Sequence, residues 1–279
     1  MSTDLTYTSH LTATSSHGRV RTSSAVKGEW TKLRSVRSTA WTLLTLAVLT
    51  LGVAAIAGVA VSGSWTTMST VERLSFDPTA LSLRGMLFGQ LVVGVLGILV
   101  MSAEYTTGTI RSTLMAVSSR TKVMFAKIAV MTVLGLVVSE VLSFGAFWLG
   151  QALLRSPAPH ASLSQPGVLR AVAGGGLVLM VLGLVALGLA TILRNTAGAI
   201  TAYVGILLVL PIIVQALPSS ISQPVTKYLP FHISDAMTSV THVLGNSPSL
   251  SPWVGFAVLC GYAAAALGVG TWLFIRRDA

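Results

Sequence analysis

"AVAGGGLVLMVLGLVALGLATIL", residues 171–193, contains no charged side chain. An apolar run of about 20 residues is long enough for a helix to cross the hydrocarbon core of a bilayer. Five further runs have the same Leu, Val, Ala and Gly composition and lack the polar alternation of barrel strands. The six predicted spans cover residues 40–62, 85–103, 128–154, 171–193, 197–217 and 253–275. The sequence therefore predicts an all-α integral membrane protein with six transmembrane helices.

The composition and the order of segments agree with this class. Hydrophobic residues make up 53% of the 279 residues and charged residues only 9%, against roughly 25% charged in soluble domains. The first run starts too late for a signal peptide. We expect residues 1–24, rich in Ser and Thr, to be a disordered cytoplasmic tail. Residues 25–38 are expected to form an amphipathic interfacial helix, and residues 39–279 a six-helix transmembrane permease domain.

The basic residues predict the orientation. If both termini are cytoplasmic, only five of the 18 lysines and arginines fall outside, namely Arg73, Arg84, Arg155, Arg170 and Lys227. Such an asymmetry is what the positive-inside rule requires. The basic residues behind the net charge of +10 would then interact with anionic membrane lipids of the inner leaflet. No nucleic-acid partner is needed to account for this charge, and we expect none. The predicted location is the cell membrane, with multiple passes.

The segment before the first span has helical apolar spacing at Val26, Trp30, Leu33 and Val36, with basic residues between them. Such a helix is suited to lie in the inner membrane interface. Its candidate functional residues are Trp30, Lys32, Leu33 and Arg34. Two interpretations are equally supported: a basic anchor beside the membrane, or a helix that also contacts a cytoplasmic partner.

A polar segment, "EYTTGTIRSTLMAVSSR" at residues 104–120, interrupts the chain between the second and third spans. The orientation places it in the cytoplasm. Ile110, Leu114 and Val117 form an apolar stripe at helical spacing, and Gly108 is suited to a bend at its entry. The pattern predicts a short helix lying across the membrane face. Its stripe could dock on a partner or merely pack against lipid.

Catalytic and metal-binding motifs are not evident. The sequence has no H-E-x-x-H, no G-x-S-x-G, no Cys/His cluster and no G-x-x-x-x-G-K-[ST] phosphate loop. We therefore expect neither an enzyme nor a resident metal. The lone Cys260 is expected to act as a small apolar residue.

Glu140 lies near the middle of the third predicted span. An ionisable group at that depth costs several kcal/mol unless it is paired, protonated or hydrated. One interpretation is a protonated carboxyl that hydrogen-bonds Ser139, Ser143 or a neighbouring helix; the other is a group lining a translocation pathway. Gln90 is its polar companion in the second span. The longest outer loop, residues 218–250, shows helical spacing at Ile233, Met237 and Val240, and its role is open.

Several stretches together resemble a family. "EWTKLRS" (29–35), "EYTTGTIRSTL" (104–114), "SRTKVMFAK" (119–127) and "KYLPF" (227–231) look like type-two ATP-binding-cassette (ABC) exporter permeases, particularly actinobacterial ones. The resemblance covers about residues 25–279. In that family, residues 104–120 would be a coupling helix docked on a separate ATPase subunit. The matching positions are Glu104, Tyr105, Gly108, Thr109, Ile110, Arg111 and Leu114. The chain has Ser118 and Ser119 where the family often has proline.

The resemblance implies an exporter built from two permease subunits, as a homodimer or heterodimer, and two ATP-binding subunits. ATP and Mg would bind the partner ATPase, and this chain would bind no cofactor. Transport would proceed by alternating access, outward, with a drug, lipid, peptide or polysaccharide as cargo, as in multidrug or antibiotic efflux. The alternatives are a secondary transporter or channel, and a membrane scaffold or sensor that transports nothing.

Overall fold

The computed structural model describes residues 22–109, 115, 119–241 and 249–276. Within these residues the regular structure is entirely helical, and six segments are long and apolar enough to cross a membrane. They are α2 (Arg37–Ser64) with η1 (Trp65–Thr67), α5 (Met86–Thr106), α7 (Arg120–Leu153), α8 (Val168–Leu193), the series α9 (Thr196–Val204), η2 (Gly205–Val209) and α10 (Leu210–Gln215), and α13 (Pro252–Arg276). The predicted all-α fold with six spans is confirmed.

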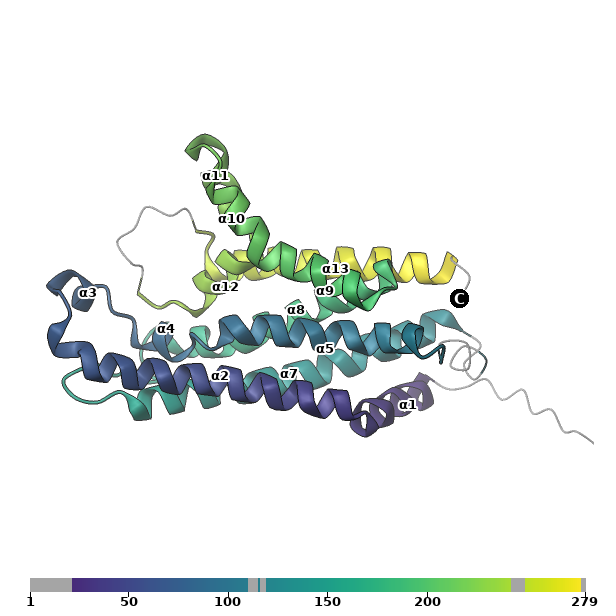
Figure 1. The fold of residues 1–279 in the computed structure, drawn as a ribbon, viewed down its shortest axis with the longest axis horizontal. Coiled ribbons are helices and arrows are strands. Elements are labelled where there is room, and N and C mark those ends of the chain that lie inside the picture. Colours follow the sequence, from purple (N-terminus) through teal and green to yellow (C-terminus); the bar gives the residue numbers. More distant parts are fainter. Residues whose placement is uncertain (1–21, 110–114, 116–118, 242–248, 277–279) are drawn as a thin grey trace, which may run out of the picture.

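Short helices mark the two ends of the bundle (Figure 1). α1 (Thr22–Ser35) lies at one end, which we call the α1 end. At that end Arg120, the first residue of α7, donates to the carbonyl oxygens of Phe274 at 3.1 Å and Ile275 at 3.4 Å in α13. The opposite end, the loop end, carries α3 (Thr70–Leu74), α4 (Pro78–Ser82), α11 (Ser219–Thr226) and α12 (Pro230–Thr238).

Local sequence explains two of these short helices. Ser69 and Glu72 form a reciprocal capping box at the start of α3, so both side chains satisfy backbone N–H groups. Asp77 caps α4 by accepting from Thr79 N and Ala80 N, and Pro78 occupies the first helical turn, where its missing N–H costs nothing.

The centre of the bundle is α8, which packs against α5, α7 and α13. Inside a membrane the hydrophobic effect does not drive helix association. Transmembrane helices associate instead through close van der Waals packing, which small residues at the interface allow. Gly97 of α5 shows this requirement, because a Cβ there would lie 2.2 Å from the carbonyl oxygen of Gly183 in α8. Ala186, Met131 and Val93, all buried, lie next to this pair of glycines.

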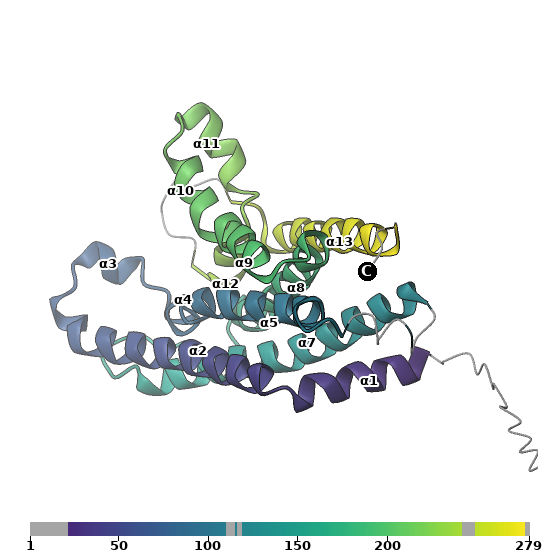
Figure 2. The same cartoon turned by 45° about the vertical axis from the view of Figure 1, so that its right-hand side comes forward.

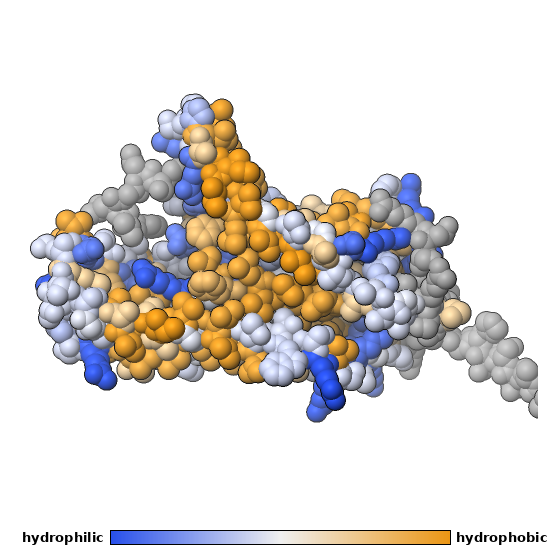
Figure 3. Space-filling view, viewed as in Figure 1, coloured by the Kyte–Doolittle hydropathy of each residue, from blue (hydrophilic) through white to orange (hydrophobic). Residues whose placement is uncertain are grey.

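The outer surface of the bundle is apolar where lipid would touch it. Large side chains such as Trp41, Ile56 and Val141 are exposed on α2 and α7. Figure 3 shows hydrophobic colouring across the middle of one face and over the projecting helices, with hydrophilic residues gathered toward the ends. This distribution is that of a membrane-spanning surface.

α5 begins level with the middle of α2 rather than at its end. A Cβ on Gly85, the residue before α5, would lie 2.0 Å from the carbonyl oxygen of Thr50, and Thr50 is near the midpoint of α2. The chain leaves α2, forms η1 and α3, and then returns through α4, which contacts α2, α7 and α8. The predicted loop 63–84 is therefore partly folded back into the bundle.

The fifth span is irregular. η2 is a π-helix, and Pro211 is the second residue of the α10 that follows it, which is consistent with the kink that proline imposes. Beyond it, α10 and α11 project away from the bundle in both views (Figures 1 and 2). The helix expected around Ile233 and Met237 is present as α12, and it ends at Thr238, before Val240.

Candidate functional site

Four charged side chains meet at the α1 end, and we call them the ion cluster: Glu29, Lys32, Glu104 and Lys127. Lys127 of α7 is 1% exposed, and its Nζ lies 2.8 Å from Glu29 Oε2 and 2.8 Å from Glu104 Oε1. The same Nζ is 3.3 Å from the carbonyl oxygen of Val100 in α5. A buried ammonium requires such compensation, because its desolvation is costly unless it is paired and hydrogen-bonded.

Lys32 closes the cluster from the surface side. Its Nζ lies 2.8 Å from Glu29 Oε1 and 2.8 Å from Glu104 Oε1. Burial lowers the pKa of Lys32, but the hydrogen bonds and charges of Glu104 and Glu29 outweigh it and raise the pKa above the usual range. Two lysines and two glutamates give zero net charge, and they join α1, α5 and α7 to one another.

Glu104 is the residue of this cluster that begins the predicted coupling segment. Its Oε2 is buried and has no hydrogen-bond partner among the described residues. If the segment is a coupling helix, Arg111 is expected to pair either with an acidic rim of the ATPase or with this carboxylate. Arg111, Ile110 and Leu114 lie outside the described residues, so that pairing stays a prediction, while the described partners of Glu104 are Lys32 and Lys127.

The next residues of the segment contact the turn between α8 and α9. The guanidinium of Arg194 lies 5.5 Å from the centre of the Tyr105 ring, a cation–π distance. Thr106 and Thr196 have their hydroxyls 3.4 Å apart. Thr109 shares a 2.8 Å hydroxyl contact with Thr107. The start of the segment thus contacts a second connection at the same end of the bundle.

Gly108 ends α5 in a left-handed conformation, with φ of +69°. This is where the sequence predicts a bend, and a side chain at this φ would be strained. A Cβ at Gly108 would meet nothing within 4 Å. The requirement for glycine is therefore one of backbone conformation and not of space.

The residues singled out in α1 separate into two groups. Lys32 takes part in the ion cluster and Leu33 packs against the core, whereas Trp30 is 44% exposed and Arg34 is exposed. The face of α1 packed against the bundle carries buried Ala25 and Glu29, not the whole apolar stripe. An exposed Trp30 is suited to contact the lipid interface.

Sequence reasoning missed Glu29 and Lys127 as functional candidates. Both stood inside the stretches that carried the family resemblance, "EWTKLRS" and "SRTKVMFAK". The available signal was opposite charge at the ends of neighbouring apolar runs. Glu104 follows the second run and Lys127 immediately precedes the third, so both lie at the same end of consecutive spans, which are usually neighbours in space.

The two candidates for a translocation pathway do not share a cavity. Gln90 is buried, donates through Nε2 to Ser234 Oγ at 2.6 Å, and lines a cavity at the loop end. Glu140 is half-buried on α7 and does not line that cavity. Its carboxyl lies against Gly176 of α8, where a Cβ would be 2.6 Å from Glu140 Cδ.

The hydrogen bonds suggested for Glu140 are not those of the structure. Ser143 donates to the carbonyl oxygen of Val172. The hydroxyl of Ser139 is buried and has no partner in the part of the chain that the structure describes. Among the described residues no hydrogen bond reaches the Glu140 carboxyl. Its role, structural or functional, stays a prediction.

Six apolar spans around a packed centre, with charge held at one end, define a multi-pass helical membrane protein. The family model described as "ABC-2 family transporter protein" matches residues 25–214, which is more than half of the chain. The chain therefore belongs to the ABC-2 family of transporter membrane proteins, whose members are permease-like transport subunits that normally lack their own ATPase motif and act with an ATP-binding subunit. Among curated proteins, none matches the chain closely enough to count as a relative.

Proposed function

We propose that this protein is the permease subunit of an ABC exporter in the plasma membrane, with the α1 end facing the cytoplasm. Two permease subunits, identical or different, would form the pathway. A separate ATP-binding subunit would hold ATP and Mg, and would drive outward transport by alternating access. The cargo would be a drug, lipid, peptide or polysaccharide-like compound.

The observation that carries this proposal is the ion cluster at the start of residues 104–120. A movement of this segment would reach the bundle through its first residues, among them Glu104, which is bonded to Lys32 of α1 and Lys127 of α7. A buried charge left without its partner costs about 3–5 kcal/mol, so the cluster resists disruption. Motion of the segment is therefore more easily passed to α1 and α7 as a unit than absorbed by breaking the cluster.

The rest of the site supports the same role. Tyr105 and Thr106 contact the α8–α9 turn, so the segment can bias the fourth and fifth spans as well. The positive φ of Gly108 redirects the chain out of α5, which would leave residues 109–118 to contact the ATPase. A transport subunit without a phosphate loop needs such a mechanical connection to a motor on another chain.

The test compares Glu104→Gln with Arg34→Gln in the complex co-expressed with its ATPase. Glu104→Gln keeps the shape but removes the charge that holds Lys32 and Lys127, whereas Arg34 is an exposed residue of α1 outside the ion cluster. We expect Glu104→Gln to retain ATPase binding and hydrolysis but to lower the transport per ATP hydrolysed. Unchanged coupling in Glu104→Gln would contradict the proposal.

A further inference from the structure

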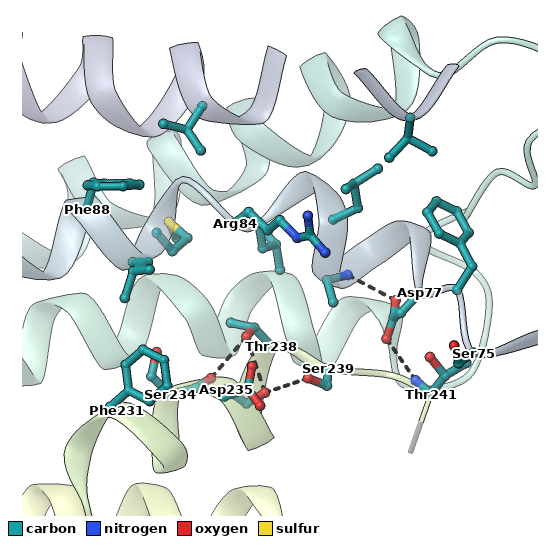
Figure 4. Close-up of a pocket in the computed structure, with 18 of the residues that line it drawn as sticks. Ser75, Asp77, Arg84, Phe88, Phe231, Ser234, Asp235, Thr238, Ser239 and Thr241 are labelled. Atoms are coloured by element: carbon teal, nitrogen blue, oxygen red, sulfur yellow. Dashed lines mark hydrogen bonds between the residues drawn. The ribbon is translucent and has the colours of Figure 1, made fainter. Parts of the chain in front are cut away.

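A cavity of about 720 Å³ opens at the loop end, within the usual range of about 300–1,000 Å³ for small-molecule sites. One wall comes from α2 and the segment that leads through α4 into α5, and the facing wall from α12 and the residues after it (Figure 4). Gln90 and Ser234, hydrogen-bonded to each other, lie among its lining residues.

Most of the polar groups in this cavity are already engaged. Asp77 accepts through Oδ1 from Thr79 N and Ala80 N, both at 2.9 Å. Its Oδ2 accepts from Val240 N at 2.6 Å and Thr241 N at 2.8 Å. Glu72 accepts from the backbone N–H and hydroxyl of Ser69, both at 2.8 Å. Both carboxylates therefore serve the local fold.

Two charged groups are left over. Arg84 and Asp235 both line the cavity, and within the described part of the chain no hydrogen bond or ion pair engages either side chain. They stand on opposite walls in Figure 4, Arg84 just before α5 and Asp235 on α12. Asp235 is exposed, yet partial burial of its carboxyl raises the pKa of this group; His232 opposes the shift and the charge of Asp77 adds to it.

Arg84 is an exposed side chain that lies level with the middle of a span. It precedes Gly85, which touches Thr50 near the middle of α2. A guanidinium at the depth of a spanning helix is normally paired or faces a water-filled cavity. The cavity also presents Val53, Leu87, Phe88 and Phe231, so an apolar body could lie beside the two charges.

We propose that this cavity binds an amphiphile whose head group carries both an anionic and a cationic group, as a phosphoethanolamine does. The anionic group binds Arg84, for which a guanidinium offers a bidentate pair of donors. The ammonium binds Asp235, and the apolar part lies on Leu87, Phe88 and Phe231. Such a ligand is complementary to both unpaired charges, whereas a singly charged head would leave one of them unpaired.

Binding to the purified full chain tests this without any ATPase, so the result is independent of the proposed coupling role. Short-chain phosphatidylethanolamine is titrated in detergent and followed by native mass spectrometry, against phosphatidylglycerol with the same chains. We expect saturable binding of the first lipid, and about tenfold weaker binding of the second, which lacks the ammonium. Equal binding of the two lipids, or no saturable binding, would overturn the proposal.

The variants assign the two charges. Arg84→Gln and Asp235→Asn should each weaken phosphatidylethanolamine binding about tenfold, and Arg84→Lys should lose less than Arg84→Gln. Arg155→Gln is the control, because Arg155 is an exposed arginine at the same end that does not line the cavity. Wild-type affinity in either Arg84→Gln or Asp235→Asn would overturn the two-charge head group.

A final arm distinguishes the source of the ligand. If ATP hydrolysis by the reconstituted complex rises as the amphiphile saturates the site, the ligand is cargo. If binding saturates and hydrolysis does not change, the ligand is a resident lipid of the outer leaflet. Both results support the binding site.

Discussion

Tyr203 donates its hydroxyl hydrogen to the backbone carbonyl oxygen of Gln90 at 2.8 Å. The tyrosine is 1% exposed in α9, and Gln90 is one of the residues that line the cavity at the loop end. The ring of Tyr203 fits where Gly94 has no side chain, since a Cβ there would lie 2.0 Å from Tyr203 Cε1. The fifth span is thus fixed to the second at one buried point.

Substitutions at the contact between Tyr203 and the second span should lower the free energy of unfolding by different amounts. We expect Tyr203→Phe to lower the free energy of unfolding by about 0.5–1.5 kcal/mol, the usual net value of one hydrogen bond. Gly94→Ala should cost more, about 1–3 kcal/mol, because the ring has to move. Thermal unfolding in detergent measures both. Gly52→Ala is the control, since a Cβ there meets nothing within 4 Å; equal effects of the two glycine changes would contradict the packing argument.

The ion cluster should behave as a unit. Lys127→Met leaves Glu29 and Glu104 near one another with only Lys32 between them, so we expect a loss of about 3–5 kcal/mol. Adding Glu29→Gln to Lys127→Met should restore part of this loss, because one uncompensated carboxylate is removed. The chemical unfolding of the two single variants and the double variant gives the coupling energy. Strict additivity would show that the charges act independently.

The predicted orientation can be tested at two lysines. Lys122, near the start of α7, is expected in the cytoplasm, and Lys227, just after α11, outside the cell. Each is replaced by cysteine in a Cys260→Ala background and exposed to a membrane-impermeant thiol reagent in intact cells. Only position 227 should react. Labelling at position 122 would contradict the predicted orientation.

The predicted coupling stripe gives a sharper test of partner binding. Ile110→Ala with Leu114→Ala removes two apolar side chains, each worth about 1.5–3 kcal/mol if fully buried against a partner. Arg111→Glu places a negative charge where an acidic rim on the ATPase is expected. All three changes should leave membrane insertion intact and weaken co-purification of the ATPase. Full retention of the ATPase would mean that the stripe packs against lipid.

Two substitutions of Glu140 distinguish a carboxyl that the span merely tolerates from one that takes part in transport. Glu140→Gln preserves hydrogen-bonding shape, and we expect folding to be kept while transport falls. Glu140→Leu removes all polarity and should fold at least as well, because an unpaired polar group in a span is removed. Transport assays in proteoliposomes compare both with wild type. Wild-type transport in both variants would leave Glu140 with a structural role only.

The spans were predictable because composition alone determines them. The predicted run 171–193 lies within α8, Val168–Leu193. The predicted run 85–103 matches α5, which begins one residue later at Met86 and extends to Thr106. Hydropathy could not predict that α5 starts beside Thr50, because this depends on the close backbone approach that Gly85 permits. The ion cluster was half predictable. Glu104 and Lys32 stood out, but pairing them with Glu29 and Lys127 required the packing of three helices.

The π-turn of the fifth span has a rotational consequence. Residues 205–209 are wound more widely than an α-helix, and one residue of an α-helix corresponds to a rotation of about 100°. If this turn tightened to α geometry, α10 and α11 would swivel about the span axis by roughly that angle. The apolar face formed by Ile212 and Ile213, now 67% and 54% exposed, would then point in a new direction. The winding of a single backbone turn in the middle of the span therefore sets the direction in which α10 and α11 face.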